Sequence, residues 1–242
     1  MKITYSDGRW VGPEQSRAIS TLKIVAVIFS SILLLAVVFR LVGSLLYSPS
    51  QYNSIFLVGG LVLGYLAADL VTGTVHWFCD SFFSEDTPLI GKGLIKPFRD
   101  HHVYPQRITR YRFYEQDTTS FFILGPILAW NMISGAAPNG PWMFLNQGFL
   151  IGISIGLFGT NFFHRWAHQR DVPPAVRWLQ RNGLILGPRH HGLHHRNHDK
   201  GYCVTSGWLN AALDKAKVFR RLEALVRYAR ECVARSWDRH DR

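Results

Sequence analysis

Histidine is the residue type that stands out for its chemistry, because ten of the eleven histidines lie in four short segments. These segments read HWFCD from His76, DHH at 100–102, HRWAH at 164–168 and RHHGLHHRNH at 189–198. Imidazole binds Zn, Cu, Fe and Ni, and ligands from several parts of a chain must converge to enclose an ion. The pattern therefore predicts a metal site rather than a solvated basic loop, and the internal, interrupted positions exclude a purification tag.

Spacing in the third segment favours shared coordination. His164 and His168 are four residues apart, so on a helix they lie on one face. Asn161 lies one turn earlier on that face. We expect both imidazoles to point towards one ion.

The other segments give less uniform spacing. His191, His194 and His195 are three and four residues apart, although two glycines and a proline nearby disfavour a helix, so a bound metal would help to hold the turn. His101 and His102 are adjacent, and adjacent residues on a helix diverge by about 100°. We therefore expect these two to lie at a helix end or to serve two ions.

Other polar residues near the histidines are expected to orient the ligands or to contact substrate. A ligating imidazole usually donates its second N–H to a carboxylate or a carbonyl, and the alternative role is helix capping or surface charge. The residues assigned to this group are Asp80, Asp100, Asn161, His190, His198 and Asp214. Asp69 differs because it lies within an apolar segment, where an ionisable group indicates either function or pairing with another helix.

The expected ligands are rich in nitrogen. Cys79, Cys203 and Cys232 are not among them, whereas a structural zinc site would more often use cysteine. About eight imidazoles favour two redox metals, with four nitrogens for each and room for an oxygen-derived ligand.

Four apolar segments must position these histidines. Residues 22–47, 54–75, 120–137 and 142–163 are each close to the roughly 20 helical residues that cross a hydrocarbon core. The first is too long for the apolar region of a cleavable signal peptide. We therefore expect four transmembrane helices in a chain that is 48% apolar and carries a net charge of +11.

Lysine and arginine predict the orientation. Of 27 such residues, four precede or open the first span, six lie between the second and third spans, and sixteen follow the fourth. The connections at 48–53 and 138–141 have none. By the positive-inside rule, both termini and the 76–118 loop are cytoplasmic, and all the histidine segments face that compartment.

These elements predict an all-α integral membrane protein, with a four-helix transmembrane bundle and a helical cytoplasmic cap that carries the histidine-rich metal site. Residues 1–21 would form a short cytoplasmic lead, and 22–242 a single domain with its cap at 164–242. No extended strand pattern is present. Residues 175–186, and those from 206 onwards, mix apolar and basic side chains as interfacial helices do, which favours anionic lipid over nucleic acid as a partner.

The order HWFCD, DHHVYP, HRWAH, PPAVRWLQRNGLIL, HHGLHH and YCVTSGWLNAALD resembles the Kua/CarF family of lipid desaturases over roughly residues 60–226. That family includes the plasmanylethanolamine desaturases, with the plant phosphatidylglycerol trans-desaturases as relatives. The resemblance implies a di-iron membrane oxidase that uses O2 and two electrons to turn the alkyl ether of plasmanylethanolamine into the vinyl ether of a plasmalogen. It places the metal ligands on His76, His101, His102, His164, His168, His191, His194 and His195.

The resemblance also implies partners. The substrate would be a membrane phospholipid, and the electron donor an acidic protein such as cytochrome b5 or ferredoxin, which a basic surface attracts. The membrane would be the bacterial inner membrane or the endoplasmic reticulum, depending on the source. Residues 112–117 (RFYEQD) depart from the family's pattern, so we expect this stretch to influence the choice of substrate or partner.

Two other functions fit the same residues. A histidine-rich fatty-acid or sterol hydroxylase shares the metal chemistry but inserts oxygen. A non-enzymatic metal-binding membrane protein would hold metal without changing a lipid. Metals at the cytoplasmic ends of the spans would meet a lipid near its headgroup, and this depth favours desaturation beside the glycerol ether.

Overall fold

The computed structural model describes residues 5–6, 9–10, 17–47, 50–88, 90–110, 118–133 and 140–240. Within these residues the chain is helical, as the sequence predicts, apart from one hairpin and the connecting turns. The hairpin joins β1 (Tyr5–Ser6) to β2 (Arg9–Trp10), with Tyr5 paired to Trp10. Our expectation of no extended segment was wrong here, because strands of two residues are too short to leave an alternating pattern in the sequence.

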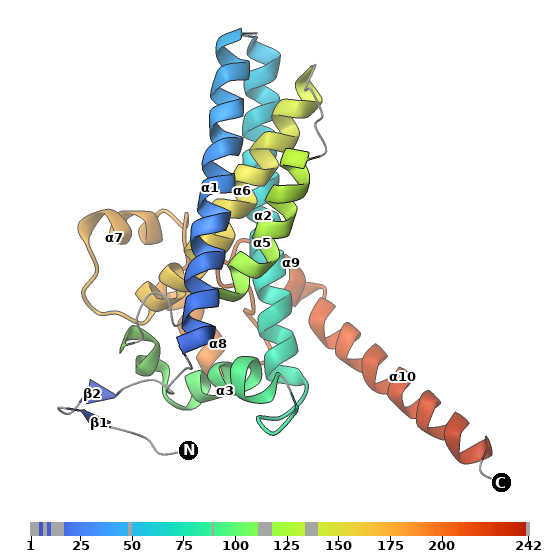
Figure 1. Ribbon diagram of the computed structural model, residues 1–242. Helices are drawn as coiled ribbons and strands as arrows, with labels where there is room; N and C mark the ends of the chain where they lie inside the picture. Colours follow the sequence, from blue (N-terminus) through green and yellow to red (C-terminus); the bar gives the residue numbers. More distant parts are fainter. Residues whose placement is uncertain are drawn as a thin grey trace.

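Four long helices run side by side (Figure 1): α1 (Arg17–Tyr47), α2 (Gln51–Ser81), α5 (Thr118–Ile133) and α6 (Pro141–Ala167). In the described part of the chain, three of them are long and apolar enough to cross a membrane, namely α1, α2 and α6. The fourth, α5, has 16 residues and is about 24 Å long, shorter than a hydrocarbon core of about 30 Å. The span expected at 120–137 is thus an apolar helix that ends at Ile133, and its last four residues lie outside the described residues.

Close contact between α2 and α6 depends on glycine. A Cβ atom on Gly64 would lie 2.1 Å from the carbonyl oxygen of Phe149, and one on Gly152 would lie 2.2 Å from that of Leu61. Small residues at every fourth position let helix backbones approach closely in a membrane. This contact fixes the relative positions of the two helices that carry His76 and His164.

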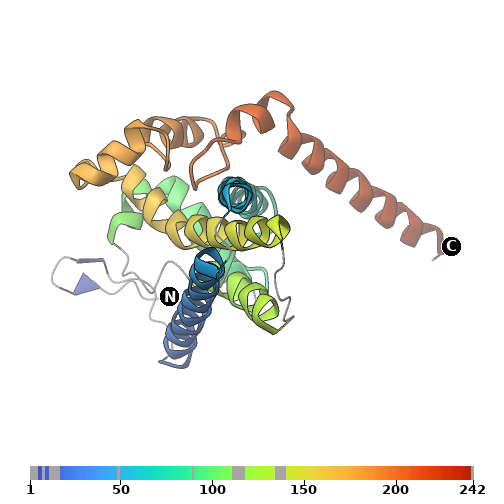
Figure 2. The same cartoon turned by 90° about the horizontal axis from the view of Figure 1, so that it is seen from above.

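Apolar side chains fill the space between the other long helices. Leu124 and Leu128 of α5 are fully buried in one cluster with Leu157 of α6. Ser30 of α1 donates a hydrogen bond to the carbonyl of Phe121 at 3.2 Å. Seen from above, α6 lies between α2 on one side and α1 and α5 on the other (Figure 2).

The shorter elements gather around one end of the bundle (Figure 1). They are η1 (Gly91–Ile95), α3 (Lys96–Val103), η2 (Pro105–Arg110), α7 (Pro174–Arg181), α8 (Pro188–Arg196) and α9 (Asn210–Lys215). The last helix, α10 (Val218–His240), extends away from this body. The first and last described elements, β1 and α10, are drawn at this same end.

Local sequence explains two helix boundaries in this region. The helix expected at 175–186 ends at Arg181, because Gly183 has a φ of +67° and the chain turns back. The helix that the nearby glycines and proline disfavour does form: Gly187 is the N-cap of α8 and Pro188 occupies its first turn. Proline is well tolerated there because its missing N–H would have no helical partner.

Candidate metal centre

Eight histidines from four elements meet at this end of the bundle. The end of α2 contributes His76, and the last turn of α3 contributes two adjacent histidines. The last turn of α6 contributes His164, and the residue that caps this helix is His168. The remaining three lie on α8. The structure divides these side chains into two groups rather than one.

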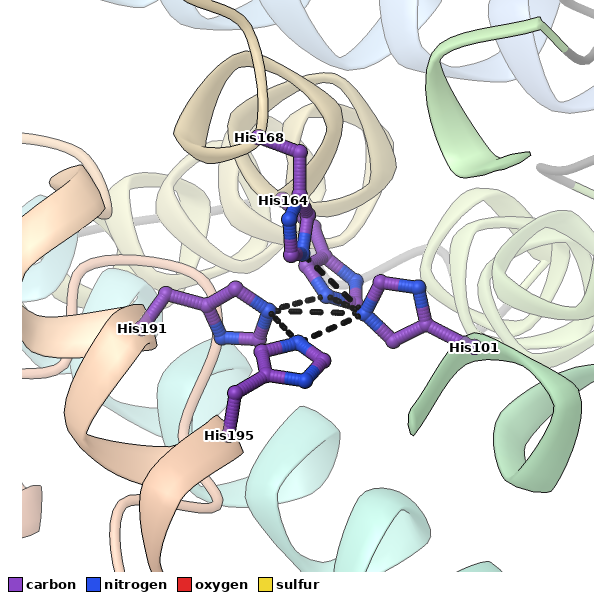
Figure 3. Close-up of side chains that lie close together, drawn as sticks. All are labelled: His101, His164, His168, His191 and His195. Atoms are coloured by element: carbon purple, nitrogen blue, oxygen red, sulfur yellow. Dashed lines mark hydrogen bonds between the residues drawn. The ribbon is translucent and has the colours of Figure 1, made fainter. Parts of the chain in front are cut away.

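The first group consists of imidazoles only (Figure 3). Its members are His101, His164, His168, His191 and His195. The Nε2 atoms of His164 and His191 are 2.8 Å apart, and the Nε2 of His101 lies 2.9 Å from that of His164. We refer to this set as the five-histidine group.

Hydrogen bonding alone cannot satisfy the five-histidine group. The Nε2 of His101 lies within 3.4 Å of the Nε2 atoms of four other imidazoles. A neutral imidazole nitrogen carries either one hydrogen or one lone pair. A bound cation would take all five lone pairs at once, so the arrangement fits a metal ion.

The second group combines three imidazoles with a carboxylate. Its members are His76, Asp80, His102 and His194, and all four ligand atoms lie within 4.8 Å of one another. The Oδ2 atom of Asp80 is 3.1 Å from the Nε2 of His102 and 3.3 Å from that of His76. We refer to this set as the His76 group.

Backbone carbonyls set the tautomers in the His76 group. The Nδ1 of His76 lies 3.0 Å from the carbonyl oxygen of Tyr202, and the Nδ1 of His194 lies 2.6 Å from that of Lys200. A carbonyl only accepts, so each Nδ1 carries the hydrogen and each neutral ring turns a lone pair towards Asp80. Neither Nε2 atom has a hydrogen-bond partner. Lone pairs that face a partly buried carboxylate need a cation between them, and the His76 group therefore also fits a metal ion.

Burial favours the neutral form of several of these imidazoles. Desolvation, together with the neighbouring imidazoles, lowers the pKa of His101 to about 2 and that of His195 to about 3. Desolvation lowers the pKa values of His168 and His194 to about 4. A neutral imidazole is the form that binds metal. At neutral pH, these histidines therefore need not lose a proton before they coordinate an ion.

Asp69, the carboxylate expected inside the membrane, contacts backbone rather than the histidines. Its Oδ1 accepts N–H groups from Thr205, Ser206 and Gly207 at 2.9–3.2 Å, and its Oδ2 accepts that of Leu209 at 3.2 Å. The side chain is fully buried. Its position therefore fits the pairing role, although the partner is a loop and not another helix.

The remaining residues of the sequence prediction occupy different surroundings. Asp100 pairs with Lys96 at 3.5 Å, and Asp214 accepts the N–H of Gly201 at 3.3 Å. The ring of His198 lies 4.3 Å from that of His102. His190 is exposed on α8, and Asn161 is partly buried one turn before His164.

Two features of the site differ from what the sequence predicts. Asp80 was expected behind the ligands, whereas in the structure its carboxylate joins three imidazoles in a group that could hold a metal ion, four residues after His76 on the same helical face. Four nitrogens per metal were also expected, whereas the groups hold five and three imidazoles. The i, i+4 spacing of His76 and Asp80 is the signal that could have indicated the first difference.

Comparison with known proteins agrees with this geometry. A family model described as the lipid desaturase domain matches residues 65–237, a range that contains both histidine groups. The chain belongs to the lipid desaturase family. Its members are enzymes, so this desaturase is an oxidoreductase with membrane helices and a histidine cluster that could hold metal ions.

Several desaturases of known name are similar to this one. The plasmanylethanolamine desaturase of Myxococcus xanthus is 36% identical over 98% of this chain and 82% of its own length. The plasmanylethanolamine desaturase 1 of Mus musculus is 34% identical over 77% of this chain and 70% of its own length. The chloroplastic fatty acid desaturase 4 of Arabidopsis thaliana is 34% identical over 72% of this chain and 53% of its own length. No solved structure matches the chain.

Proposed function

We propose that this protein is a membrane di-iron desaturase that uses O2 to introduce the vinyl ether double bond of plasmalogens into plasmanylethanolamine. The observation that carries the proposal is the pair of convergent ligand groups at the ends of α2 and α6. The named relatives support the choice of lipid, since one that aligns with nearly the whole chain is a plasmanylethanolamine desaturase.

Each group would hold one iron ion. The five-histidine group offers nitrogen only, whereas the His76 group adds the carboxylate of Asp80. Bound iron would supply O2 activation, which the cleavage of an unactivated C–H bond requires and which acid–base side chains do not provide. The chain itself supplies orientation: the carbonyls of Lys200 and Tyr202 keep the Nε2 atoms of His194 and His76 free of hydrogen.

The overall reaction would remove two hydrogens from adjacent carbons beside the glycerol ether oxygen. One O2, two electrons and two further protons balance these hydrogens as two molecules of water. The electrons must come from a donor protein such as cytochrome b5 or ferredoxin. Sixteen lysines and arginines lie from Arg165, in the last turn of α6, to the end of the sequence, and this positive charge would attract an acidic donor.

The proposed topology has four crossings and one domain over residues 22–242. Since α2 ends beside the histidines and α6 begins at the opposite end of the bundle, α5 would lie in the crossing between them, which the sequence places at residues 120–137 (Figure 1). With lysine and arginine concentrated at the histidine end, both termini would be cytoplasmic, and residues 164–242 would form the cap. At this depth the irons would lie near the glycerol backbone of a lipid.

Lipid analysis tests the reaction. The chain is expressed in cells that make alkyl ether lipids but no plasmalogens, and the lipids are treated with mild acid, which cleaves only vinyl ethers. We expect fatty aldehyde that depends on O2, is lost in His168→Ala and is kept in the exposed-site control His190→Ala. A lipid heavier by one oxygen would indicate a hydroxylase. An acyl chain lighter by two hydrogens would indicate the activity named for the plant relatives.

Cysteine labelling tests the topology. Tyr52, beside the first connection, is 71% exposed, and Asp86 is exposed at the histidine end. In intact cells an impermeant thiol reagent should modify Tyr52→Cys and spare Asp86→Cys. The reverse pattern would contradict the proposed orientation.

A further inference from the structure

The segments around Gly183 and Trp208 lie beside the part of α2 that is inside the membrane. With 31 residues, α2 is about 46 Å long, and the roughly 20 residues that cross a hydrocarbon core would extend from Gln51 to about position 71. Tyr65 lies within this range and His76 beyond it. Any tilt of α2 would move the boundary towards His76 and would leave Tyr65 inside.

Two contacts fix the depth of these segments. The hydroxyl of Tyr65 donates a hydrogen bond to the carbonyl of Leu184 at 2.6 Å, and its ring meets that of Trp208 edge-on at 5.7 Å. Eleven residues of α2, or about 16 Å, separate Tyr65 from His76. Helical side chains also lean towards the N-terminus, which in α2 is the end far from the histidines. We call Gly183, Leu184 and Trp208 the cap tip.

Hydrogen bonds within the protein satisfy the backbone N–H groups of the cap tip and the carbonyls of Gly183 and Leu184. The indole N–H of Trp208 donates to the carbonyl of Gly183. The backbone N–H groups of Gly183 and Leu184 donate to residues of α7. The N–H of Trp208 donates to the hydroxyl of Ser206, and the four N–H groups around it donate to Asp69. Irregular backbone at membrane depth needs this internal satisfaction, whereas a loop in water does not.

Apolar surface at the cap tip continues that of α2. Leu184 is 37% exposed and Trp208 44% exposed. Val58 and Val62, which lie seven and three residues before Tyr65 on nearly the same face of α2, are also exposed. An apolar surface that adjoins a membrane-spanning helix on one side has acyl chains as its natural partner.

The helix that leads to the cap tip has interfacial character. Trp178 of α7 is 59% exposed, and Arg177 and Arg181, on either side of it in the sequence, are exposed as well. Tryptophan and arginine both favour the level of the lipid headgroups. Figure 1 shows α7 above α3 and α8, at the height of the lower part of the long helices.

We propose that the cap tip is embedded among the acyl chains of the cytoplasmic leaflet, so that the cap enters the membrane instead of resting on it. A phospholipid beside the tip has its chains against α2 between Val62 and the histidine end, and its glycerol region lies towards His76. Arg177 and Arg181 are at the level of its phosphate. This placement depends on the membrane-spanning role of α2 and not on the reaction.

Spin-label depth measurements test the proposal in the full-length protein, reconstituted in bilayers of phosphatidylethanolamine and phosphatidylglycerol. The background is Cys232→Ser, because the other two cysteines are buried. Nitroxides are placed at Leu184→Cys and Trp208→Cys, with Val62→Cys as the membrane control and Asp86→Cys as the aqueous control. The measured quantity is the ratio of collision with O2, which concentrates in the bilayer, to collision with a polar nickel chelate.

We expect the ratio at both tip positions to be severalfold above that at Asp86→Cys and to approach that at Val62→Cys. Ratios equal to that of the aqueous control would overturn the proposal. If a labelled variant does not fold, quenching by brominated lipid replaces it. Bromine on the acyl chains quenches tryptophan fluorescence, and the quenching should be smaller in Trp208→Phe than in the wild type by the amount expected of a tryptophan among the acyl chains. Equal quenching in both proteins would overturn the proposal. Both experiments read depth, so failure of the proposed reaction would leave their result unchanged.

Discussion

His101 and His102 are adjacent in α3, yet their imidazoles belong to different ligand groups. The Nε2 of His101 lies 2.9 Å from that of His164, whereas the Nε2 of His102 lies 3.1 Å from the Oδ2 of Asp80. Because adjacent side chains diverge on the last turn of α3, this short helix contributes one imidazole to the five-histidine group and one to the His76 group. The histidines of α8 divide in the same way, with His194 in the group opposite to its neighbours.

This division predicts selective metal loss. His102→Ala should empty the His76 group and reduce the iron content from about two ions per chain to about one, since each replaced imidazole opens a coordination position. His101→Ala should do the same to the five-histidine group. Elemental analysis gives the number, and Mössbauer spectra should show a different remaining site in each variant. His190→Ala is the control, and identical spectra for both variants would contradict two separate groups.

A second prediction concerns Asp80. Asp80→Asn keeps the shape of the side chain but removes the charge that faces three imidazoles. We expect activity to fall at least about 10- to 100-fold, with loss of the metal of the His76 group. The matched control is Asp100→Asn, which removes a carboxylate paired with Lys96. Full metal content in Asp80→Asn would show that this residue orients a ligating imidazole and does not itself bind the metal, as the sequence predicts.

A third prediction concerns Asp69. In Asp69→Ala, four backbone N–H groups, three of them buried, lose their acceptor, and an unsatisfied buried donor costs about 1–3 kcal/mol. We expect a much lower unfolding temperature in detergent. Asp69→Asn should recover most of it, because the amide oxygen can still accept the three N–H groups at Oδ1. Equal stability of the alanine variant and the wild type would show that the loop does not depend on this carboxylate.

A fourth prediction follows from the histidine pKa values in the metal-free protein. The folded pKa of His194 is about 4 and that of His195 about 3, below the ordinary value of about 6.5. Between these values the unfolded chain binds more protons than the folded one. Stability is therefore fully present above pH ~6.5 and is lost as the pH falls towards 4. The midpoint temperature of unfolding should fall as the pH is lowered from neutral to acidic values. The fall should be less steep in His195→Gln than in the wild type, and His190→Ala should follow the wild type.

The sequence alone determined the features that depend on local spacing. Hydropathy over 20 or more residues identified the apolar helices, because the thickness of the bilayer sets their length. The i, i+4 spacing of His164 and His168 placed both imidazoles on one side of one helix end, because 3.6 residues make a turn. The ordered histidine motifs also indicated the lipid desaturase family, which the matching family model confirms.

Only the tertiary structure decided which side chains meet. The separation of His101 from His102, the position of Asp80 beside His102 and His194, and the backbone partners of Asp69 all depend on contacts between segments far apart in the chain. The glycine contact of α2 with α6 sets these distances. The spacing of glycines within each helix permits a close contact but does not specify which helix is the partner. The depth of the cap tip has the same origin, because Tyr65 and Leu184 are 119 residues apart and are brought together by packing alone.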